Sequence, residues 1–271
     1  AHDTCSEITE IYRAIRYGVK RFLQQIGISK MTIGVSGGID SAVTAAFYVD
    51  ILGPDNVLLV NMPSMYNSPL TKNLALMLAE SLKCNYCVMP IQESVDHTNA
   101  QLTQTPIHNY YSNTTFSLEL SSLARENIQA RDRTRLLAAL ASSFGGGFSC
   151  NSNKAEITIG YATFYGDLTG VLAMIGDLWK NQVYELGHYL NDKIFNLDVI
   201  PEEIFKISPS AELSAEQTVG VGGDPMIYEY HDFLFRAFVE RWDKASPSDI
   251  LLWYMEGTLE ETIGCQKGTV K

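Results

Sequence analysis

Six consecutive residues, Ser36-Gly37-Gly38-Ile39-Asp40-Ser41, combine the groups that a phosphate-binding loop requires. The two glycines let the backbone approach an anion closely, and the two serines add hydroxyl donors. If a helix starts at this point, its free amide groups and the positive end of its dipole attract phosphate. Asp40 stands where a carboxylate can hold Mg²⁺ against phosphate oxygens. The string therefore predicts a binding site for a nucleoside triphosphate.

The same loop bears on which phosphate bond is broken. The common triphosphate loop follows the pattern G-x-x-x-x-G-K-[ST], in which the lysine draws charge onto the leaving γ-phosphate. Here no lysine follows Gly37 and Gly38, so cleavage at another phosphate bond becomes plausible. A bare Ser-Gly-Gly turn before a helix is also compatible with a purely structural role.

The segments around the loop alternate between two kinds of hydrophobic pattern. An apolar segment over 31–35 is typical of a strand, and the segment over 40–52 that follows the loop is typical of a helix. Strands that alternate with helices pair in parallel through right-handed crossovers. The other expected elements are helices over 8–26, 71–82, 119–144, 179–190 and 230–242, strands over 57–60, 86–91 and 148–150, and a loop over 220–225.

These patterns predict an α/β fold. We expect a doubly wound, mostly parallel open sheet with helices on both faces and a mainly helical C-terminal region. The ligand of such a sheet lies beyond the carboxyl ends of the strands. The chain has 271 residues, of which 46% are hydrophobic and 19% charged, and no stretch has the composition of a linker. A single domain over 1–271 is therefore expected.

Composition narrows the choice of partners and compartment. A formal net charge of −11 argues against binding of nucleic acid, because that affinity depends on clustered lysines and arginines. No apolar run reaches the ~18 residues that a bilayer span requires, so no membrane association is expected. The five scattered cysteines do not resemble a secreted disulfide framework, which favours the cytoplasm. Cys84 and Cys87 form a C-x-x-C pair that we interpret as structural rather than redox-active or zinc-binding.

Motifs beyond the loop point to a family. In order and spacing they resemble those of the N-type ATP pyrophosphatases, and within that superfamily the NAD synthetases, above all the synthetase domain of the glutamine-dependent type. The resemblance extends from about residue 11 to residue 217. The matching strings are SGGIDS at 36–41, ENIQARDR at 126–133, NSNKAE at 151–156, GYATFYGD at 160–167, DLWK at 177–180 and PSAEL at 209–213.

The resemblance implies a fold and a reaction. The fold would be Rossmann-like, of the adenine nucleotide α-hydrolase type. ATP would be cleaved between its α- and β-phosphates, which adenylates the carboxylate of nicotinic acid adenine dinucleotide and releases pyrophosphate. Ammonia would then displace AMP to give NAD. The cofactors implied are ATP as co-substrate and Mg²⁺.

The resemblance also assigns residues to roles. Asp40, Lys180 and Arg131 would be catalytic, and Asp40 and Glu156 would hold the metal, with Glu156 alternatively a dinucleotide ligand. Asn127, Glu156, Tyr161 and Asp167 would line the dinucleotide site. The residues implied at ATP are Ser36, Gly37, Gly38, Asp40, Ser41, Met62, Arg131, Asn151, Lys180 and Ser210.

Each assignment has a structural alternative. Arg131 also fits a solvated helix face, Tyr161 a core position and Lys180 a charge on a helix surface. Asp167 also fits a turn carboxylate after a glycine. Two departures from the family pattern add to this. Asn151-Ser152 replaces a Thr-Gly pair, and the residues over 217–223 replace an expected Asp-Glu pair.

The nitrogen source and the assembly are expectations of the same kind. No cysteine has the surroundings of a glutaminase nucleophile, and the five histidines show no metal or triad spacing. We therefore expect free ammonia, or ammonia from a separate glutaminase domain or partner, and the family implies a homodimer. Two alternatives stay open: a related pyrophosphatase that amidates or thiolates a GMP precursor or tRNA, and a nucleotide-binding homologue with impaired catalysis. Ala1 in place of Met leaves open whether a further domain precedes the chain.

Overall fold

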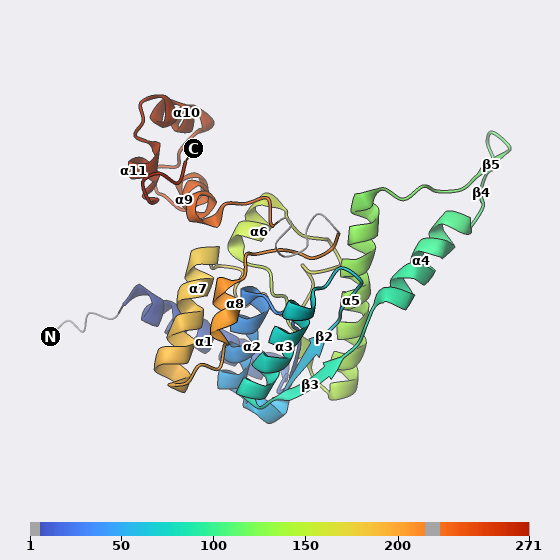
Figure 1. Ribbon diagram of the computed structural model, residues 1–271, viewed down its shortest axis with the longest axis horizontal. Coiled ribbons are helices and arrows are strands. Elements are labelled where there is room, and N and C mark those ends of the chain that lie inside the picture. The colour runs from blue at the N-terminus through green and yellow to red at the C-terminus, as the bar shows by residue number, and fades with distance from the viewer. Residues whose placement is uncertain (1–5, 215–222, 271) are drawn as a thin grey trace.

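A computed structural model describes residues 6–214 and 223–270, and its centre is a parallel sheet (Figure 1). Met31, in an inner strand of this sheet, pairs with Val57 on one side and with Gly147 on the other. All neighbouring strands run parallel, so the predicted open parallel α/β sheet is confirmed. In spatial order the strands are β3 (Asn85–Val88), β2 (Val57–Asn61), β1 (Met31–Gly34) and β6 (Gly147–Phe148).

Helices cover both faces of the sheet, as predicted. On one face, α2 (Ile39–Leu52) packs between the sheet and two outer helices, α1 (Glu7–Ile26) and α7 (Lys180–Tyr189). Its residues are apolar nearly all round, and most of them are buried, which is typical of an internal helix. α3 (Pro69–Leu82) lies in the same hydrophobic core. The opposite face is covered by α5 (Ser122–Phe144), whose Leu137 packs in a second core under the sheet.

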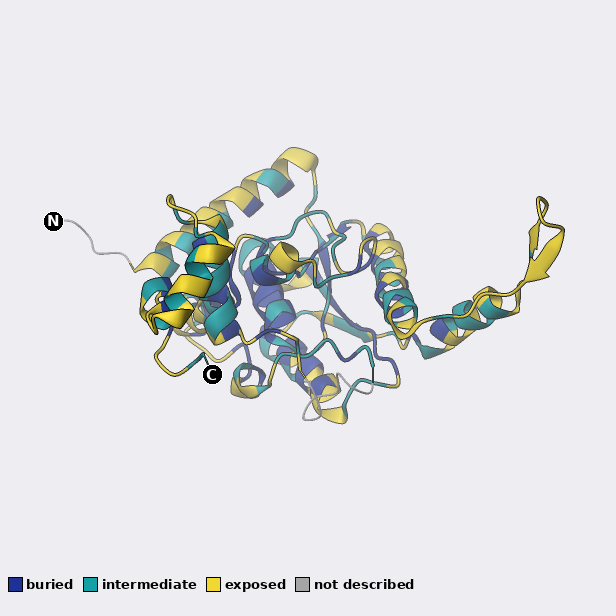
Figure 2. Ribbon diagram, turned by 90° about the horizontal axis from the view of Figure 1, so that it is seen from above, coloured by how far each residue is buried: buried dark blue, intermediate teal, exposed yellow. Residues whose placement is uncertain are grey.

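An arm that the sequence analysis did not predict leaves the body beside α5 (Figures 1 and 2). The predicted strand over 86–91 ends at Val88, and α4 (Gln92–Gln104) follows. The chain then forms a hairpin from β4 (Ile107–Asn109) and β5 (Thr114–Phe116). The segment escaped prediction because it is polar and lacks a long apolar period.

Two predicted boundaries near α5 also differ in the structure. The helix begins at Ser122 rather than near residue 119, because the hydroxyl of Ser121 accepts a hydrogen bond from the Ala124 amide and caps it. The strand expected over 148–150 is β6, and Cys150 lies beyond it in an isolated bridge to Ala173.

The C-terminal region is mainly helical, as predicted, and α9 (Tyr228–Val239) packs against α7 and α6 (Lys154–Ile159). Of the loop expected over 220–225, residues 220–222 lie outside the described residues. None of the described helices has both the length and the apolar character of a membrane span. The helices after β6 are α6 (Lys154–Ile159), α7, a π-helical turn over Leu190–Phe195, α8 (Glu202–Lys206), α9 (Tyr228–Val239), α10 (Pro247–Met255) and α11 (Leu259–Ile263).

Cys84 and Cys87 lie at the end of α3 and in β3 as free thiols, each partly buried. Burial raises the pKa of the Cys84 thiol to about 11 and raises that of Cys87 as well. A thiol of raised pKa is a poor nucleophile and a poor metal ligand at neutral pH. The geometry agrees with a structural role for the pair.

Candidate active site

The segment from Ser36 to Ser41, called the phosphate loop below, follows β1 at the carboxyl end of the sheet and includes the first residues of α2. Gly38 is the N-cap of α2, and Gly37 has a φ of 89°, which favours glycine. A Cβ on Gly37 would also lie 2.3 Å from the carbonyl oxygen of Thr71, at the start of α3. Two independent reasons therefore favour glycine at position 37: the positive φ of its backbone and the close contact with the backbone of α3.

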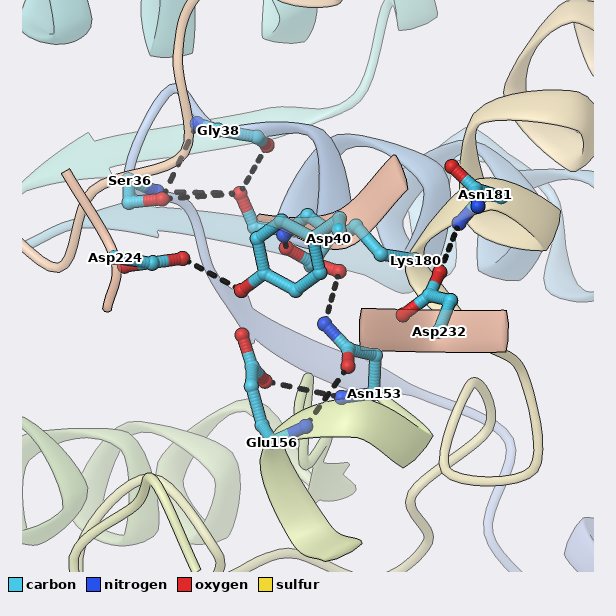
Figure 3. A network of polar contacts seen from close by, with 11 residues as sticks. Ser36, Gly38, Asp40, Asn153, Glu156, Lys180, Asn181, Asp224 and Asp232 are labelled. Carbon is cyan, nitrogen blue, oxygen red and sulfur yellow. Dashed lines mark hydrogen bonds and ion pairs between the residues drawn. The ribbon is translucent and has the colours of Figure 1, made fainter. Parts of the chain in front are cut away.

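The two serine hydroxyls of the loop bond within it. Ser36 Oγ accepts from the Gly38 amide at 3.2 Å, and Ser41 Oγ donates to the Gly38 carbonyl at 3.0 Å. These bonds hold the loop in shape against the first turn of α2 (Figure 3). A loop of this shape at a helix N-terminus has the geometry that suits an anion.

Asp40, in the first turn of α2, is held from two sides. Its Oδ2 forms an ion pair with Lys180 Nζ, and its Oδ1 accepts a hydrogen bond of 3.0 Å from Asn153 Nδ2 (Figure 3). Lys180 is the first residue of α7 and only 2% exposed. Burial alone would lower the pKa of Lys180, but the charges of Asp40 and Glu156 outweigh it and raise that pKa above its usual value. A permanent positive charge therefore lies beside the phosphate loop.

Asn153 links Asp40 to Glu156. Its side-chain oxygen accepts from the Glu156 amide, and Glu156 Oε2 accepts from the Asn153 amide, each at 3.1 Å. This is a capping box that starts α6. Burial, and then the charge of Asp40, raise the pKa of Glu156 well above its usual range. The sequence analysis gave Asn153 no role, although an Asn three residues before a Glu is the sequence signal of such a cap.

A pocket of about 290 Å³ opens at this end of the sheet, between the loop, α5, α6 and the segment before residue 214. Its position beyond the carboxyl ends of the strands agrees with the expectation for an open α/β sheet. Gly37 belongs to the loop but not to the lining. The predicted site residues that line the pocket are Ser36, Gly38, Asp40, Ser41, Met62, Asn151, Glu156, Tyr161, Asp167, Lys180 and Ser210.

Asn127 and Arg131 are not among the residues that line this pocket. Arg131 is exposed on α5, and its Nε donates to the carbonyl of Phe164 at 3.1 Å. Asn127 accepts a hydrogen bond of 2.7 Å from the hydroxyl of Thr163. Both side chains therefore hold the loop over 160–167 from outside the pocket. The role of Arg131 on ATP phosphates stays a prediction that this geometry does not favour.

Asn151 and Asp167 each carry a structural bond in the pocket wall. Asn151 Nδ2 donates to the Gly34 carbonyl at 2.9 Å, so this amide ties the segment that follows β6 to the end of β1. Asp167 Oδ1 accepts from the Thr163 amide at 2.6 Å, as a turn carboxylate does. Burial raises the pKa of Asp167.

Two aspartates on the C-terminal side escaped the sequence analysis. Asp224 lines the pocket and accepts a hydrogen bond of 2.7 Å from the hydroxyl of Tyr228, whose ring lies under Lys180 with the ammonium 4.9 Å from its centre. Asp232, which is 1% exposed, accepts from the Asn181 amide at 2.9 Å. It thereby caps α7 directly after Lys180 (Figure 3). Neither aspartate stands in a motif, so only the fold reveals them.

Residues 6–214 and 223–270 contain no group of three or more His, Cys, Asp or Glu side chains arranged to hold a metal ion. The charges of Asp40 and Glu156 nevertheless interact, because Asp40 contributes to the raised pKa of Glu156. Mg²⁺ is commonly held by one or two carboxylates together with substrate phosphates. The two carboxylates fit that arrangement once a nucleotide supplies oxygens.

Comparison with known proteins shows the family of this chain. The family model described as NAD synthase matches residues 11–252. Glutamine-dependent NAD(+) synthetases from Synechocystis sp. and from Xylella fastidiosa strain Temecula1 are 37% and 35% identical, each over 89% of this chain. The structure of the glutamine-dependent NAD+ synthetase from Acinetobacter baumannii, in complex with ADP, is similar with a TM-score of 0.68 and 27% identity.

The chain spans less than half the length of these relatives. It covers 40% of the Synechocystis protein and 42% of the Xylella protein. The alignment with the Acinetobacter structure covers 97% of this chain and 44% of that one.

Proposed function

We propose that this chain, which belongs to the NAD synthase family, uses ATP to amidate nicotinic acid adenine dinucleotide to NAD. The observation that carries the proposal is the ion pair of Lys180 with Asp40 beside the phosphate loop. It places a fixed positive charge and a carboxylate at the site where the triphosphate would lie. The ADP complex of the Acinetobacter relative supports binding of an adenine nucleotide.

In the proposed reaction a carboxylate oxygen of the dinucleotide attacks the α-phosphorus of ATP. The bond to the bridging oxygen breaks, and pyrophosphate leaves with that electron pair. Ammonia then attacks the acyl carbon, AMP departs with the carboxylate oxygen, and the nitrogen loses a proton. The amides of the loop from Ser36 to Ser41 orient the triphosphate, and Lys180 stabilises the charge that develops on it.

Asp40 and Glu156 are the proposed residues for Mg²⁺. When bound there with the nucleotide, the metal would neutralise charge on the phosphates and polarise them. Asn153 orients both side chains, because its side-chain Nδ2 donates to Asp40 Oδ1 and its backbone N–H donates to Glu156 Oε2. The network therefore holds both side chains in place before any cation arrives, and a bound cation would favour the ionised form of Glu156.

The dinucleotide is proposed to extend toward Asn127 and Arg131, outside the phosphate pocket, with Tyr161 and Asp167 between. Asn127 and Arg131 both lie on α5, the helix that follows the arm in the chain. The tip of the arm exposes Tyr110 and Tyr111 by 90% and 100%. Exposed aromatic side chains on a projecting hairpin are typical of a contact surface. They support the proposal of a homodimer that completes the dinucleotide site.

We also propose one domain over 1–271, acting in the cytoplasm. The ammonia would be free or would come from a glutaminase domain or partner. The relatives named glutamine-dependent support the second source.

The proposal is tested by incubating the protein with Mg-ATP, the dinucleotide and either ammonium or glutamine. NAD, AMP and pyrophosphate are expected in equal amounts with ammonium. Formation of ADP would exclude adenylation. Amidation of a GMP precursor instead of the dinucleotide, or ATP binding without AMP formation, would replace the proposal by one of its alternatives.

A further inference from the structure

Arg133 lies on α5 two residues beyond Arg131, which turns it about 200° around the helix. It faces the pocket, whereas Arg131 is exposed on the outside. Its Nε donates to the Met62 carbonyl at 3.1 Å, and one Nη donates to the Asn67 side-chain oxygen at 3.3 Å. The guanidinium is thereby anchored where β2 ends and the chain enters α3.

The charge of Arg133 is compensated only indirectly. No carboxylate of the described residues lies within 4 Å of it in an ion pair, although Asn67 bridges it to Glu212, with Nδ2 donating to Oε2 at 2.9 Å. Removal of water from the guanidinium lowers its pKa to about 10, and Glu212, Asp132 and Asp167 offset only part of that effect. Arg133 is half-buried, and a cation that has lost part of its water without a directly bonded anion is destabilised. An anionic ligand in the pocket would relieve that cost.

Glu212 fixes the surroundings of this cation. It is 3% exposed and accepts further hydrogen bonds from the Ser68 amide at 3.2 Å and the Thr71 hydroxyl at 2.9 Å. Its φ of 47° is unusual for a residue with a side chain and persists where the surroundings hold it in place. The backbone of Thr71 is the surface on which Gly37 of the phosphate loop packs. Glu212 thus positions both Arg133 and one wall of the loop.

The geometry points to Arg133 as a further ligand-binding residue that contacts a phosphate group of the bound nucleotide, with Glu212 as its positioning residue through Asn67. The phosphate belongs either to ATP or to the pyrophosphate bridge of the dinucleotide. The identity of these ligands rests on the proposed function. Arg133 lines the pocket and is anchored by Met62 and Asn67 whichever nucleotide binds there.

The test is calorimetric binding of ATP, AMP, adenosine and the dinucleotide, each alone, to the whole chain. Arg133→Met is expected to weaken binding of at least one phosphate-bearing ligand by roughly tenfold or more, because hydrogen bonds to charged groups are the strong ones. Adenosine binding is expected to stay unchanged. Loss with ATP and AMP identifies the ATP phosphates, whereas loss with the dinucleotide alone identifies its pyrophosphate.

Unchanged affinity for every phosphate-bearing ligand overturns the inference, as does an equal loss with adenosine. Arg135→Met is the matched control, because Arg135 lies on the same helix, is 59% exposed and pairs with Asp132 outside the pocket. Arg133→Lys, which keeps the charge, should restore part of the affinity. The binding test does not measure turnover, so the two proposals can fail separately. If Arg133→Met weakens phosphate binding but the wild type forms no NAD, the proposed reaction is refuted and this inference stands.

The role of Glu212 is tested by combining two substitutions. Glu212 accepts hydrogen bonds from Asn67, Ser68 and Thr71, and Glu212→Gln replaces one of its acceptor oxygens by an NH₂ donor. The substitution should therefore release Asn67 and weaken binding of the same phosphate-bearing ligand. In the Arg133→Met background the same substitution should cause no further loss. Additive losses, or equal loss with adenosine, would mean that Glu212 acts on the fold in general and not through Arg133.

Discussion

Asp40 and Lys180 form a buried ion pair although 140 residues separate them. The pair joins Asp40, in the first turn of α2, to Lys180, the first residue of α7. It therefore places the ammonium group of Lys180 beside the phosphate loop. Lys180 is almost fully buried, so its ammonium group would be left without its carboxylate partner inside the protein if Asp40 were removed. Several expected outcomes derive from this pair and from the residues around it.

Lys180→Met should affect both stability and turnover. It leaves Asp40 without its cation, and breaking a buried pair in this way costs about 3–5 kcal/mol. The positive charge beside the triphosphate is also lost, which should lower kcat by roughly 100- to 1000-fold. Denaturant unfolding and steady-state kinetics measure the two effects. Lys206→Met, at an exposed ion pair on α8, is the control and should change neither by much. Near-normal kcat in the Lys180 variant would remove this lysine from the reaction.

Asn153 should separate a structural effect from a functional one. Asn153→Asp keeps an acceptor for the Glu156 amide, and therefore the cap of α6, but it loses the donor to Asp40 and sets a carboxylate against it. Turnover should fall while α6 stays folded. Asn153→Ala should lose the cap as well, with about 1 kcal/mol of stability. Full activity in Asn153→Asp would show that Asp40 needs no bond from this side chain.

Removal of divalent cations should abolish AMP formation without changing the melting temperature of the nucleotide-free protein. In that state Asp40 is already bonded to Lys180 and Asn153, so the fold does not depend on a cation. Activity before and after chelation, with Mg²⁺ restored, and a thermal melt make the comparison. A large fall in melting temperature on chelation would point to a structural metal instead. Asp40→Asn should remove turnover even with Mg²⁺ present.

Asp232 should make stability depend on pH. Burial raises its pKa to about 6 from a usual value of 3.8, so the folded protein holds this proton more tightly than the unfolded chain. The resulting stability is complete below about pH 4 and is lost as the pH rises through about 6. Between pH 4 and pH 7 the unfolding free energy of the wild type should therefore fall by about 1–3 kcal/mol relative to Asp232→Asn. Parallel curves for the two proteins would exclude the effect.

Replacement of Tyr110 and Tyr111 by serine should shift the proposed dimer toward monomers. Both rings are exposed at the tip of the arm, so the substitution removes apolar contact area without disturbing a core. Sedimentation at micromolar concentration measures the assembly. If the second copy completes the dinucleotide site, KM for the dinucleotide should rise while ATP binding is kept. Tyr17→Ser, on the exposed side of α1, is the control. A wild-type chain that sediments as a monomer would refute the dimer itself.

The sequence alone was sufficient to predict those features that depend on residues close together in the chain. A strand, a glycine-containing turn and a helix follow one another over 31–52, so the phosphate loop could be located and its anion-binding character derived. The alternation of strands and helices predicted the parallel sheet for the same reason, because each element carries its own hydrophobic period. The polar arm lacks such a period, and it was missed.

The tertiary structure decided what lies between distant segments. Periodicity places Arg131 and Arg133 on one helix but does not tell which of them faces the ligand, because that depends on how α5 packs on the sheet. Asn153 reaches Asp40 across 113 residues, and Glu212 reaches Asn67 across 145. Such contacts arise when separate elements are packed into one core, and no local pattern records them. The sequence determined the chemistry of the phosphate loop, and only the packing of the elements determined which charges surround it.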